Sequence, residues 1–173
     1  APSSADVSLK GKRVLITAGP TYEKIDPVRF IGNYSTGRMG YAIAREAARR
    51  GAEVTLVSGP VSLSLDSSAV DIVRVESARE MLAACENVFD DCDIAVMCAA
   101  VADYAPATYV DHKIKRETDD MPSIALVKNP DIAATLGKRK RDDQILVGFA
   151  LETDNADVNG AGKRRRKKLD MIV

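Results

Sequence analysis

The chain has no tryptophan, a single histidine and three cysteines among its 173 residues. One histidine gives little support to a histidine-rich metal site or to a Ser-His-Asp triad. His112 lies in a charged stretch, so we expect it to be solvated rather than catalytic. Cys85, Cys92 and Cys98 are odd in number and lack the spacing of a zinc site, which indicates reduced thiols in a cytoplasmic protein.

The chain also has no excess of charge of one sign, because 25 Lys and Arg residues balance 25 Asp and Glu residues. A chain without net charge has no overall field that favours nucleic acid or a membrane surface. No apolar run reaches the ~18 residues of a membrane span, and no signal peptide opens the chain. We therefore expect no nucleic-acid or membrane partner, and we interpret the basic run 163–168 as an exposed helix face.

Hydrophobic residues make up 46% of the chain, which is enough for a globular core. Apolar, β-branched runs alternate with segments of helical period, and this alternation predicts an α/β fold. We expect a doubly wound, mostly parallel Rossmann-like sheet with helices on both faces. Its strands are predicted at 13–18, 53–58, 71–75, 93–100, 123–127, 145–150 and 169–173. Residues 1–11 are predicted to be a tail or linker, and 12–173 a single domain.

The first predicted helix spans 37–50, and its apolar face is expected to carry Met39, Ala42, Ile43 and Ala47. Ser35 and Thr36 offer hydroxyl caps just before it.

Two further helix starts carry capping residues. Ser77 and Glu80 have the spacing of a capping box. Another helix is predicted to begin at Asn129-Pro130-Asp131, with Asn129 as the cap. The basic segment 157–168 is also predicted to be helical.

The most unusual stretch is 16–40, which joins the first strand to the first helix. Such a connection usually takes ~2–6 residues, so we expect a loop of this length to bind a ligand. Free N–H groups at the helix start, with Gly37 and Gly40 allowing close approach, predict an anion site. Arg29 and Asn33 can bind a carboxylate or a phosphate. The alternative is an ordinary capped helix after a long loop.

In a doubly wound sheet, ligands bind beyond the carboxyl ends of the strands, where the strand order reverses. The loops after the first, fourth and sixth strands are therefore expected to meet. They bring into one region Arg29, Asn33, Asp103, Lys113 and Phe149.

A basic run, Lys113, Lys115 and Arg116, follows Asp103 in the second of these loops. Lysines on a loop suit a polyphosphate, because they stabilise the charge that develops on it. An acidic residue such as Asp103 can hold a ribose hydroxyl or a magnesium-bound water. A solvated surface run for the lysines, and a turn role for Asp103, stay open as alternatives.

A dinucleotide is disfavoured by the spacing of the glycines. The fingerprint requires G-x-G-x-x-G in a tight turn directly after the first strand. Here Gly19 stands alone, and the pair Gly37 and Gly40 comes too late in the loop. Ser58 and Gly59 occupy the place of the acidic residue that would bind the ribose. A nicotinamide-dependent reductase on a Rossmann-like fold stays an alternative.

Seven stretches carry a family resemblance: ITAGPTYEKIDPVRFIGNYSTGRMGYAIA, VTLVSGPVSL, CAAVADYAPA, KIKR, LVKNPDI, VGFALET and KKLDMIV. In this order and spacing the chain resembles phosphopantothenoylcysteine synthetase, the ligase half of the bacterial bifunctional coenzyme A biosynthesis flavoprotein. The resemblance covers nearly the whole chain from Lys12. The family's final loop, strand and helix have no counterpart after 173, so we expect a C-terminally incomplete ligase domain.

The resemblance implies a CTP-dependent ligation in two steps. The carboxylate of 4′-phosphopantothenate attacks CTP, which gives an acyl-cytidylate and pyrophosphate. The amine of L-cysteine then displaces CMP and forms 4′-phosphopantothenoyl-L-cysteine. The KIK-type basic loop points to CTP, because relatives that lack this loop use ATP. Magnesium is expected mainly through the triphosphate.

The resemblance also implies partners. We expect a homodimer and a fused or separate flavin-dependent decarboxylase, with no flavin in this chain. A non-catalytic nucleotide-binding domain is the other alternative.

The resemblance assigns roles to individual residues. Lys113 would stabilise phosphate charge during activation, and the Asn33 amide would donate a hydrogen bond to the acyl intermediate. Contacts to CTP are implied for Met97, Cys98, Ala99, Asp103, Lys113, Pro130, Asp131, Ile132, Ala133, Phe149, Lys163 and Lys167. Backbone groups at 97–99 and at Phe149 would contact the cytosine. Contacts to phosphopantothenate are implied for Arg29, Asn33, Gly37, Gly40 and Ala100, with Arg29 as a candidate for a contact across the dimer.

Overall fold

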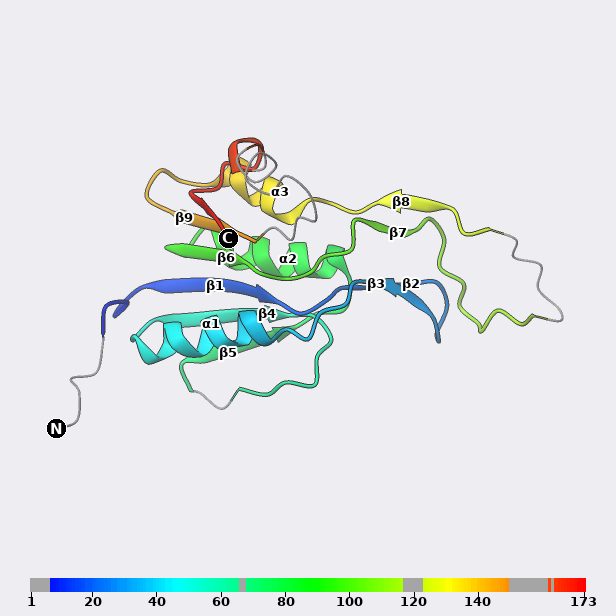
Figure 1. Ribbon diagram of the computed structural model, residues 1–173, viewed down its shortest axis with the longest axis horizontal. Helices are drawn as coiled ribbons and strands as arrows, with labels where there is room; N and C mark the ends of the chain where they lie inside the picture. Colours follow the sequence, from blue (N-terminus) through cyan, green and yellow to red (C-terminus); the bar gives the residue numbers. More distant parts are fainter. Residues whose placement is uncertain (1–6, 66–67, 117–122, 150–161, 163) are drawn as a thin grey trace.

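A computed structural model describes residues 7–65, 68–116, 123–149, 162 and 164–173. Within these residues the main sheet has six parallel strands in the order β10-β9-β6-β1-β4-β5 (Figure 1). This is the strand order of a doubly wound Rossmann-like sheet, so the predicted fold class is confirmed. The strands are β1 Arg13–Ala18, β4 Glu53–Ser58, β5 Val70–Arg74, β6 Ile94–Met97, β9 Ile145–Gly148 and β10 Met171–Ile172.

Helices cover both faces of this sheet. The helix α1, Arg38–Arg49, packs on one face, and α2, Ala78–Phe89, and α3, Ile132–Arg139, pack on the other (Figure 1). The central strand β1 is buried on both faces because successive side chains of a strand point to opposite sides. Leu15 belongs to the core beneath α2, whereas Val14 and Ile16 belong to the core beneath α1.

The buried face of α1 differs from the predicted one. The helix contacts the sheet through Gly40, Tyr41, Ala44 and Ala47, while Met39 is 58% exposed and Ala42 is exposed. A Cβ on Gly40 would lie 2.5 Å from the Cβ of Ala18, so only glycine lets the helix approach β1 this closely. The prediction was therefore wrong for Met39 and Ala42, whereas Ala47 is buried and Ile43 packs against the core as predicted.

The start of α1 also differs from the prediction. Its N-cap is Gly37, which has a φ of 75° and receives no side-chain cap. Ser35 instead accepts a hydrogen bond from the Gly37 N–H at 3.3 Å. A left-handed cap favours glycine, so the hydroxyl caps expected from Ser35 and Thr36 are not formed.

The other two helix starts give one confirmation and one correction. Ser77 and Glu80 form the predicted capping box on α2. The N-cap of α3 is Asp131, whose side chain accepts from the Ala134 N–H at 3.0 Å. Asn129 is therefore not the cap, and its amide donates to the carbonyl of Ala102. The helix predicted at 157–168 falls mostly outside the described residues.

Four short strands form an arm that projects from the carboxyl ends of the main strands (Figure 1). Tyr22–Lys24 (β2) pairs with Phe30–Gly32 (β3), and Tyr104–Pro106 (β7) pairs with Leu126–Lys128 (β8), both antiparallel. We call residues 21–34, 103–116 and 123–128 the arm. The strand predicted at 123–127 corresponds to β8, so its assignment to the main sheet was wrong. It is exposed along its length, since it pairs only with β7.

The structure agrees with the predictions of reduced cysteines and of a solvated histidine. All three thiols are free, and burial raises the pKa of Cys85 to about 12 and that of Cys92 to about 11. His112 is exposed beside Asp111, with 3.0 Å between Nδ1 and Oδ1. In the described part of the chain, no helix is long and apolar enough to cross a membrane.

The contact between α1 and β1 makes a prediction about Gly40. Alanine is favoured over glycine in a helix by ~1 kcal/mol, but overpacking costs about 1–3 kcal/mol. Because the added methyl would collide with Ala18, we expect Gly40→Ala to lower the free energy of unfolding by up to about 2 kcal/mol in urea titrations. Met39→Ala, on the exposed face of the same helix, is the control and should change little. A stabilised Gly40→Ala protein would contradict the close packing.

Candidate functional site

The loops after β1 and β6 meet at the point where the strand order reverses. Pro20 and Ala100 form a parallel bridge, and the Ala100 N–H donates to the carbonyl of Gly19 at 2.9 Å. The Thr21 hydroxyl accepts from the Ala102 N–H at 3.0 Å. This is the place where doubly wound sheets bind their ligands, and the predicted meeting of these two loops is confirmed.

A pocket of about 210 Å³ opens beside this junction. Its walls come from the ends of β1, β6 and β9, the start of α3 and the residues around Lys167. The implied CTP contacts that line it are Met97, Ala99, Asp103, Pro130, Asp131, Ile132, Ala133, Phe149 and Lys167. Cys98 and Lys113 do not line it, and Lys163 lies outside the described residues.

An ion pair lies at the pocket wall. The Lys167 ammonium is 3.0 Å from Oδ2 of Asp131, whose other oxygen caps α3. The first N–H groups of α3 follow Asp131, and such groups lack partners within the helix. The arrangement can therefore offer both a cation and backbone donors to an anion, provided that Lys167 leaves its carboxylate partner.

Thr17 is a pocket residue that the sequence reasoning missed. It is 1% exposed, and its hydroxyl oxygen accepts from the N–H groups of Cys98 and Ala99, each at 3.1 Å. The carbonyl of Met97 accepts from the Phe149 N–H at 3.3 Å. The N–H groups of residues 98 and 99 therefore already donate to Thr17. Fewer backbone donors are left for the contacts to cytosine that the family resemblance implies. A polar residue near the end of the apolar run Arg13–Ala18 was the available signal.

Asn129 is a second missed residue. Its backbone N–H donates to the carbonyl of Asp103 and its side-chain amide donates to that of Ala102, both at 2.8 Å. These bonds hold the loop after β6 against the start of α3. Its Oδ1 is buried in the pocket wall and has no partner within the described residues. A buried acceptor without a hydrogen bond costs roughly 1–3 kcal/mol of stability. A hydrogen-bond donor on a ligand would therefore satisfy this oxygen.

The residues implied for phosphopantothenate fall into two groups. Asn33 donates from Nδ2 to the carbonyl of Val101 at 3.0 Å, and Ala100 lies in the bridge beside it. Gly37 and Gly40 are buried against the residues around Gly19 and Ala18. These four surround the junction of the loops after β1 and β6.

Arg29 lies apart from these residues, in the turn between β2 and β3. Its guanidinium binds Asp26 and donates to the carbonyl of Ile114 at 2.9 Å. It is therefore placed beside the segment that carries Lys113, not beside the start of α1. Of the five residues expected in one region, Asp103 and Phe149 share the pocket, Asn33 is at the junction, and Arg29 and Lys113 lie on the arm.

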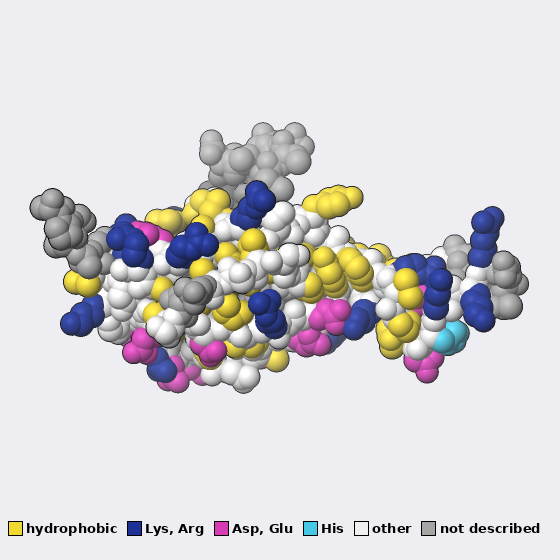
Figure 2. Space-filling view, turned by 90° about the horizontal axis from the view of Figure 1, so that it is seen from below, with side chains coloured by type: hydrophobic (Ala, Val, Ile, Leu, Met, Phe, Trp, Pro, Cys, Tyr) yellow, Lys and Arg dark blue, Asp and Glu magenta, His cyan; other side chains and the backbone are white. Residues whose placement is uncertain are grey.

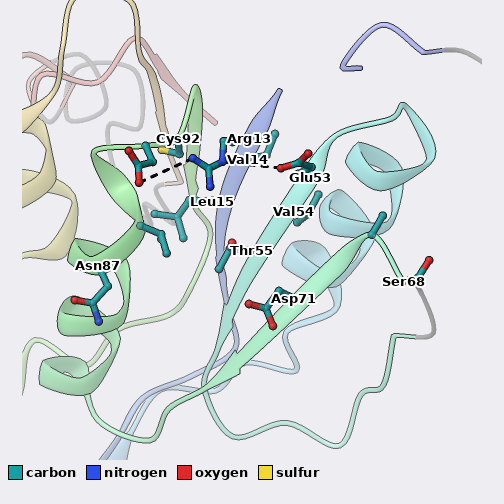
Figure 3. Close-up of a pocket in the computed structure, with 13 residues that line it drawn as sticks. Arg13, Val14, Leu15, Glu53, Val54, Thr55, Ser68, Asp71, Asn87 and Cys92 are labelled. Atoms are coloured by element: carbon teal, nitrogen blue, oxygen red, sulfur yellow. Dashed lines mark ion pairs between the residues drawn. The ribbon is translucent and has the colours of Figure 1, made fainter. Parts of the chain in front are cut away.

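A second cavity, of about 500 Å³, lies at the opposite end of the sheet (Figure 3). It runs along the amino ends of β1 and β4 beside α2, and it contains none of the implied site residues. Arg13 is 3.9 Å from each of two carboxylates, Glu53 and Asp91. Because ligands of this fold bind at the carboxyl ends, we do not place the site here.

The hydroxyl of Thr17 makes a prediction. Thr17→Val keeps the shape but leaves two N–H groups without their acceptor, and each such loss costs roughly 1–3 kcal/mol. We expect urea unfolding to show a loss of roughly 2–6 kcal/mol for Thr17→Val, the sum for the two N–H groups, and a much smaller loss for Thr17→Ser, which retains the hydroxyl. Equal stability of the two variants would show that the hydroxyl does not hold residues 98 and 99.

Comparison with known proteins identifies relatives along nearly the whole chain. The family described as DNA/pantothenate metabolism flavoprotein C-terminal domain matches residues 9–173. Coenzyme A biosynthesis bifunctional protein CoaBC of Escherichia coli (strain K12) is 50% identical over 166 residues, 95% of this chain and 41% of that protein. CoaBC of Vibrio vulnificus (strain YJ016) is 49% identical over 165 residues, 95% of this chain and 41% of that protein. A protein named cysteine/cysteine sulfinic acid decarboxylase, from an unknown prokaryotic organism, is 56% identical over 165 residues, 95% of this chain and 46% of that protein.

The chain thus spans less than half the length of these curated relatives. Among solved structures, the C-terminal domain of CoaBC has a TM-score of 0.85 at 48% identity, over 96% of this chain and 78% of that one. A Cab2 mutant complex with phosphopantothenate-cysteine has a TM-score of 0.76 at 19% identity, over 93% and 71%, and supports the fold alone. The chain therefore belongs to the DNA/pantothenate metabolism flavoprotein C-terminal domain family, to which the C-terminal region of CoaBC corresponds.

Proposed function

We propose that this chain is a CTP-dependent phosphopantothenate–cysteine ligase domain of coenzyme A biosynthesis. It would act in the cytoplasm beside a fused or separate flavin-dependent decarboxylase. The observation that carries the proposal is the pocket at the strand-order reversal, lined by most of the residues implied for CTP. The family membership and the similarity to the C-terminal domain of CoaBC support it.

The pocket suits one part of a nucleoside triphosphate. Its volume of about 210 Å³ is below the ~300–1,000 Å³ usual for ligand sites, so it would take the base and the ribose. Asp103 can accept a hydrogen bond from a ribose hydroxyl, and the unpaired Oδ1 of Asn129 can accept a hydrogen bond from the nucleoside. The triphosphate would extend towards Lys167 and the first turn of α3.

Magnesium fits this arrangement as a companion of the triphosphate. No group of three or more His, Cys, Asp or Glu side chains in the described part of the chain could hold a metal ion. The carboxylates of Asp103 and Asp131 at the pocket are oxygen donors of the kind that Mg²⁺ accepts directly or through water. When bound, the ion would neutralise charge on the phosphate oxygens.

The two half-reactions place different demands on Lys113, which lies on the arm, and on Asn33, which lies at the junction. Carboxylate attack on CTP builds negative charge on phosphate, which an ammonium such as Lys113 stabilises. Attack of the cysteine amine builds charge on the acyl oxygen, which the amide of Asn33 can stabilise by donating a hydrogen bond. In the free protein that amide donates to the carbonyl of Val101, so it is already directed at the junction.

Lys113 lies on the arm, and the arm is also the surface on which a homodimer can form. The arm exposes a set of large apolar side chains, and Figure 2 shows yellow and blue patches on the projecting part of the molecule. Exposed apolar side chains gathered on one part of the surface favour a protein–protein interface there. We propose that the arms of two copies pack together. The exposed apolar arm residues are Val28, Phe30, Tyr34, Tyr104, Tyr109, Ile124, Leu126 and Val127.

The dimer can be tested with a charge in the arm. Leu126 is 49% exposed on β8, and we expect Leu126→Glu to shift the protein from dimer to monomer in sedimentation-velocity experiments, because a buried unpaired carboxylate is costly. Met39→Glu, which places the same charge on the exposed face of α1, should leave the dimer intact. A wild-type protein that is monomeric at all concentrations would refute the proposed assembly.

The ligase activity can be tested by separating its half-reactions. We expect Asn33→Asp to release pyrophosphate from CTP and 4′-phosphopantothenate but to form little amide with cysteine, because a carboxylate cannot donate to the acyl oxygen. Pyrophosphate, CMP and amide are measured in parallel, with ATP as the alternative nucleoside triphosphate, and the binding of CTP, ATP and NADH is compared by calorimetry. Asn87→Asp, an exposed change on α2, is the control.

Three outcomes would count against these assignments. Amide formation at the wild-type rate by Asn33→Asp would remove the role of Asn33. Binding of CTP without any turnover would indicate a non-catalytic nucleotide-binding domain. Preference for NADH would favour a reductase.

A further inference from the structure

A buried carboxylate lies in the turn of the β2–β3 hairpin. Asp26 is 1% exposed, although the hairpin itself projects from the body of the protein. Its Oδ1 accepts from the backbone N–H groups of Val28 and Arg29, at 2.9 and 2.8 Å. Its Oδ2 accepts from the Arg29 guanidinium through both Nε and Nη2. The side-chain hydrogen bond from Arg29 is the main reason that the pKa of Asp26 lies well below its usual value.

The same two side chains bind a segment far along the chain. The Ile114 N–H donates to Oδ2 of Asp26 at 3.2 Å, and the carbonyl of Ile114 accepts from Nη2 of Arg29 at 2.9 Å. Both backbone groups of one residue are thus held by one ion pair. A third bond, from the Val110 N–H to the carbonyl of Ile25 at 3.0 Å, aligns the segment with the hairpin.

Ile114 is flanked by Lys113 and Lys115, so the ion pair sets the backbone position of this basic run. On its other side the hairpin continues through β3 to Asn33, which is bonded to Val101 at the junction. The Asp26–Arg29 pair therefore connects the segment that carries Lys113 to the strand that leads to Asn33. Small displacements of a reacting group are costly in catalysis, so a fixed link of this kind has a chemical use.

We propose that Asp26 and Arg29 are positioning residues that clamp the Lys113 segment to the hairpin and thereby fix Lys113 relative to Asn33. The contacts that form the clamp are independent of the proposed ligase function, and only the use of the clamp in catalysis rests on that function. This assigns to Arg29 a structural partner on its own chain, and the phosphopantothenate contact implied by the family resemblance stays a prediction.

The clamp is tested first without any activity. Asp26→Asn keeps the size of the side chain but removes the charge that holds Arg29. Because native-state proteolysis follows the population of locally opened chain, we expect trypsin to cut after Lys113 and Lys115 at least about tenfold faster in this variant. Asp111→Asn, a change in the same loop at a side chain that is 92% exposed, is the matched control and should leave the cleavage rate unchanged.

A second variant covers the risk that Asp26→Asn does not fold. Arg29→Gln changes a half-exposed side chain and removes the same guanidinium, and it should accelerate the same cleavages. Unchanged cleavage at Lys113 and Lys115 in a folded variant of either residue would overturn the clamp.

The positioning role is tested by a double-mutant cycle on pyrophosphate release. If Asp26 acts through Lys113, Asp26→Asn should slow the release in the wild-type background and have little further effect in Lys113→Gln. An equal loss in both backgrounds would refute positioning, even if the clamp were intact. A wild-type protein that releases no pyrophosphate would count against the proposed function instead, and the trypsin result would still decide the clamp.

Discussion

The pairing of β1 with a strand on each side is the constraint on which the rest of the structure depends. Because β1 runs parallel to both β4 and β6, its loop and the loop after β6 must leave the sheet at the same edge and side by side. The bridge between Pro20 and Ala100 continues this pairing beyond the strands. Thr17 fixes the turn out of β6, and Asn129 fixes the next stretch of the same loop. The pocket is the space that these loops enclose.

Close approach of backbone to backbone is the second determinant of the site. Gly40 brings α1 against β1, and a Cβ on Gly59 would lie 1.7 Å from the carbonyl oxygen of Pro20. Gly40, at the end of the long stretch, and Gly59, directly after β4, therefore have a packing function whether or not an anion binds at the start of α1. An anion site at the start of α1 stays a prediction, and it is compatible with this packing because the first N–H groups of the helix are unaffected by it.

The sequence was sufficient for the main sheet but not for the arm. Strands β1 and β4 have the predicted bounds, because a continuous apolar run between turn residues specifies a buried strand. The arm strands are three residues long and largely exposed, so they carry no such pattern. The hydrophobic pattern also predicted the wrong residues for the buried face of α1. Met39 is more hydrophobic than Gly40, and the pattern carries no information on how closely the helix backbone approaches β1. The pocket residues came from a family resemblance, and the partners of Asp26 are too distant in sequence for any local pattern to reveal.

The arm has a consequence for the order in which the chain folds. Arg29 and Ile114 are 85 residues apart, and their contact requires the ends of β1 and β6 to be neighbours already. Closing a loop of that length first would cost chain entropy before any core has formed, so we expect the contact between the hairpin and residue 114 to form last. By the same reasoning it is the part that opens first, ahead of the strands buried on both faces. A chain caught before this step presents unpaired short strands, which makes the stage before closure prone to aggregation.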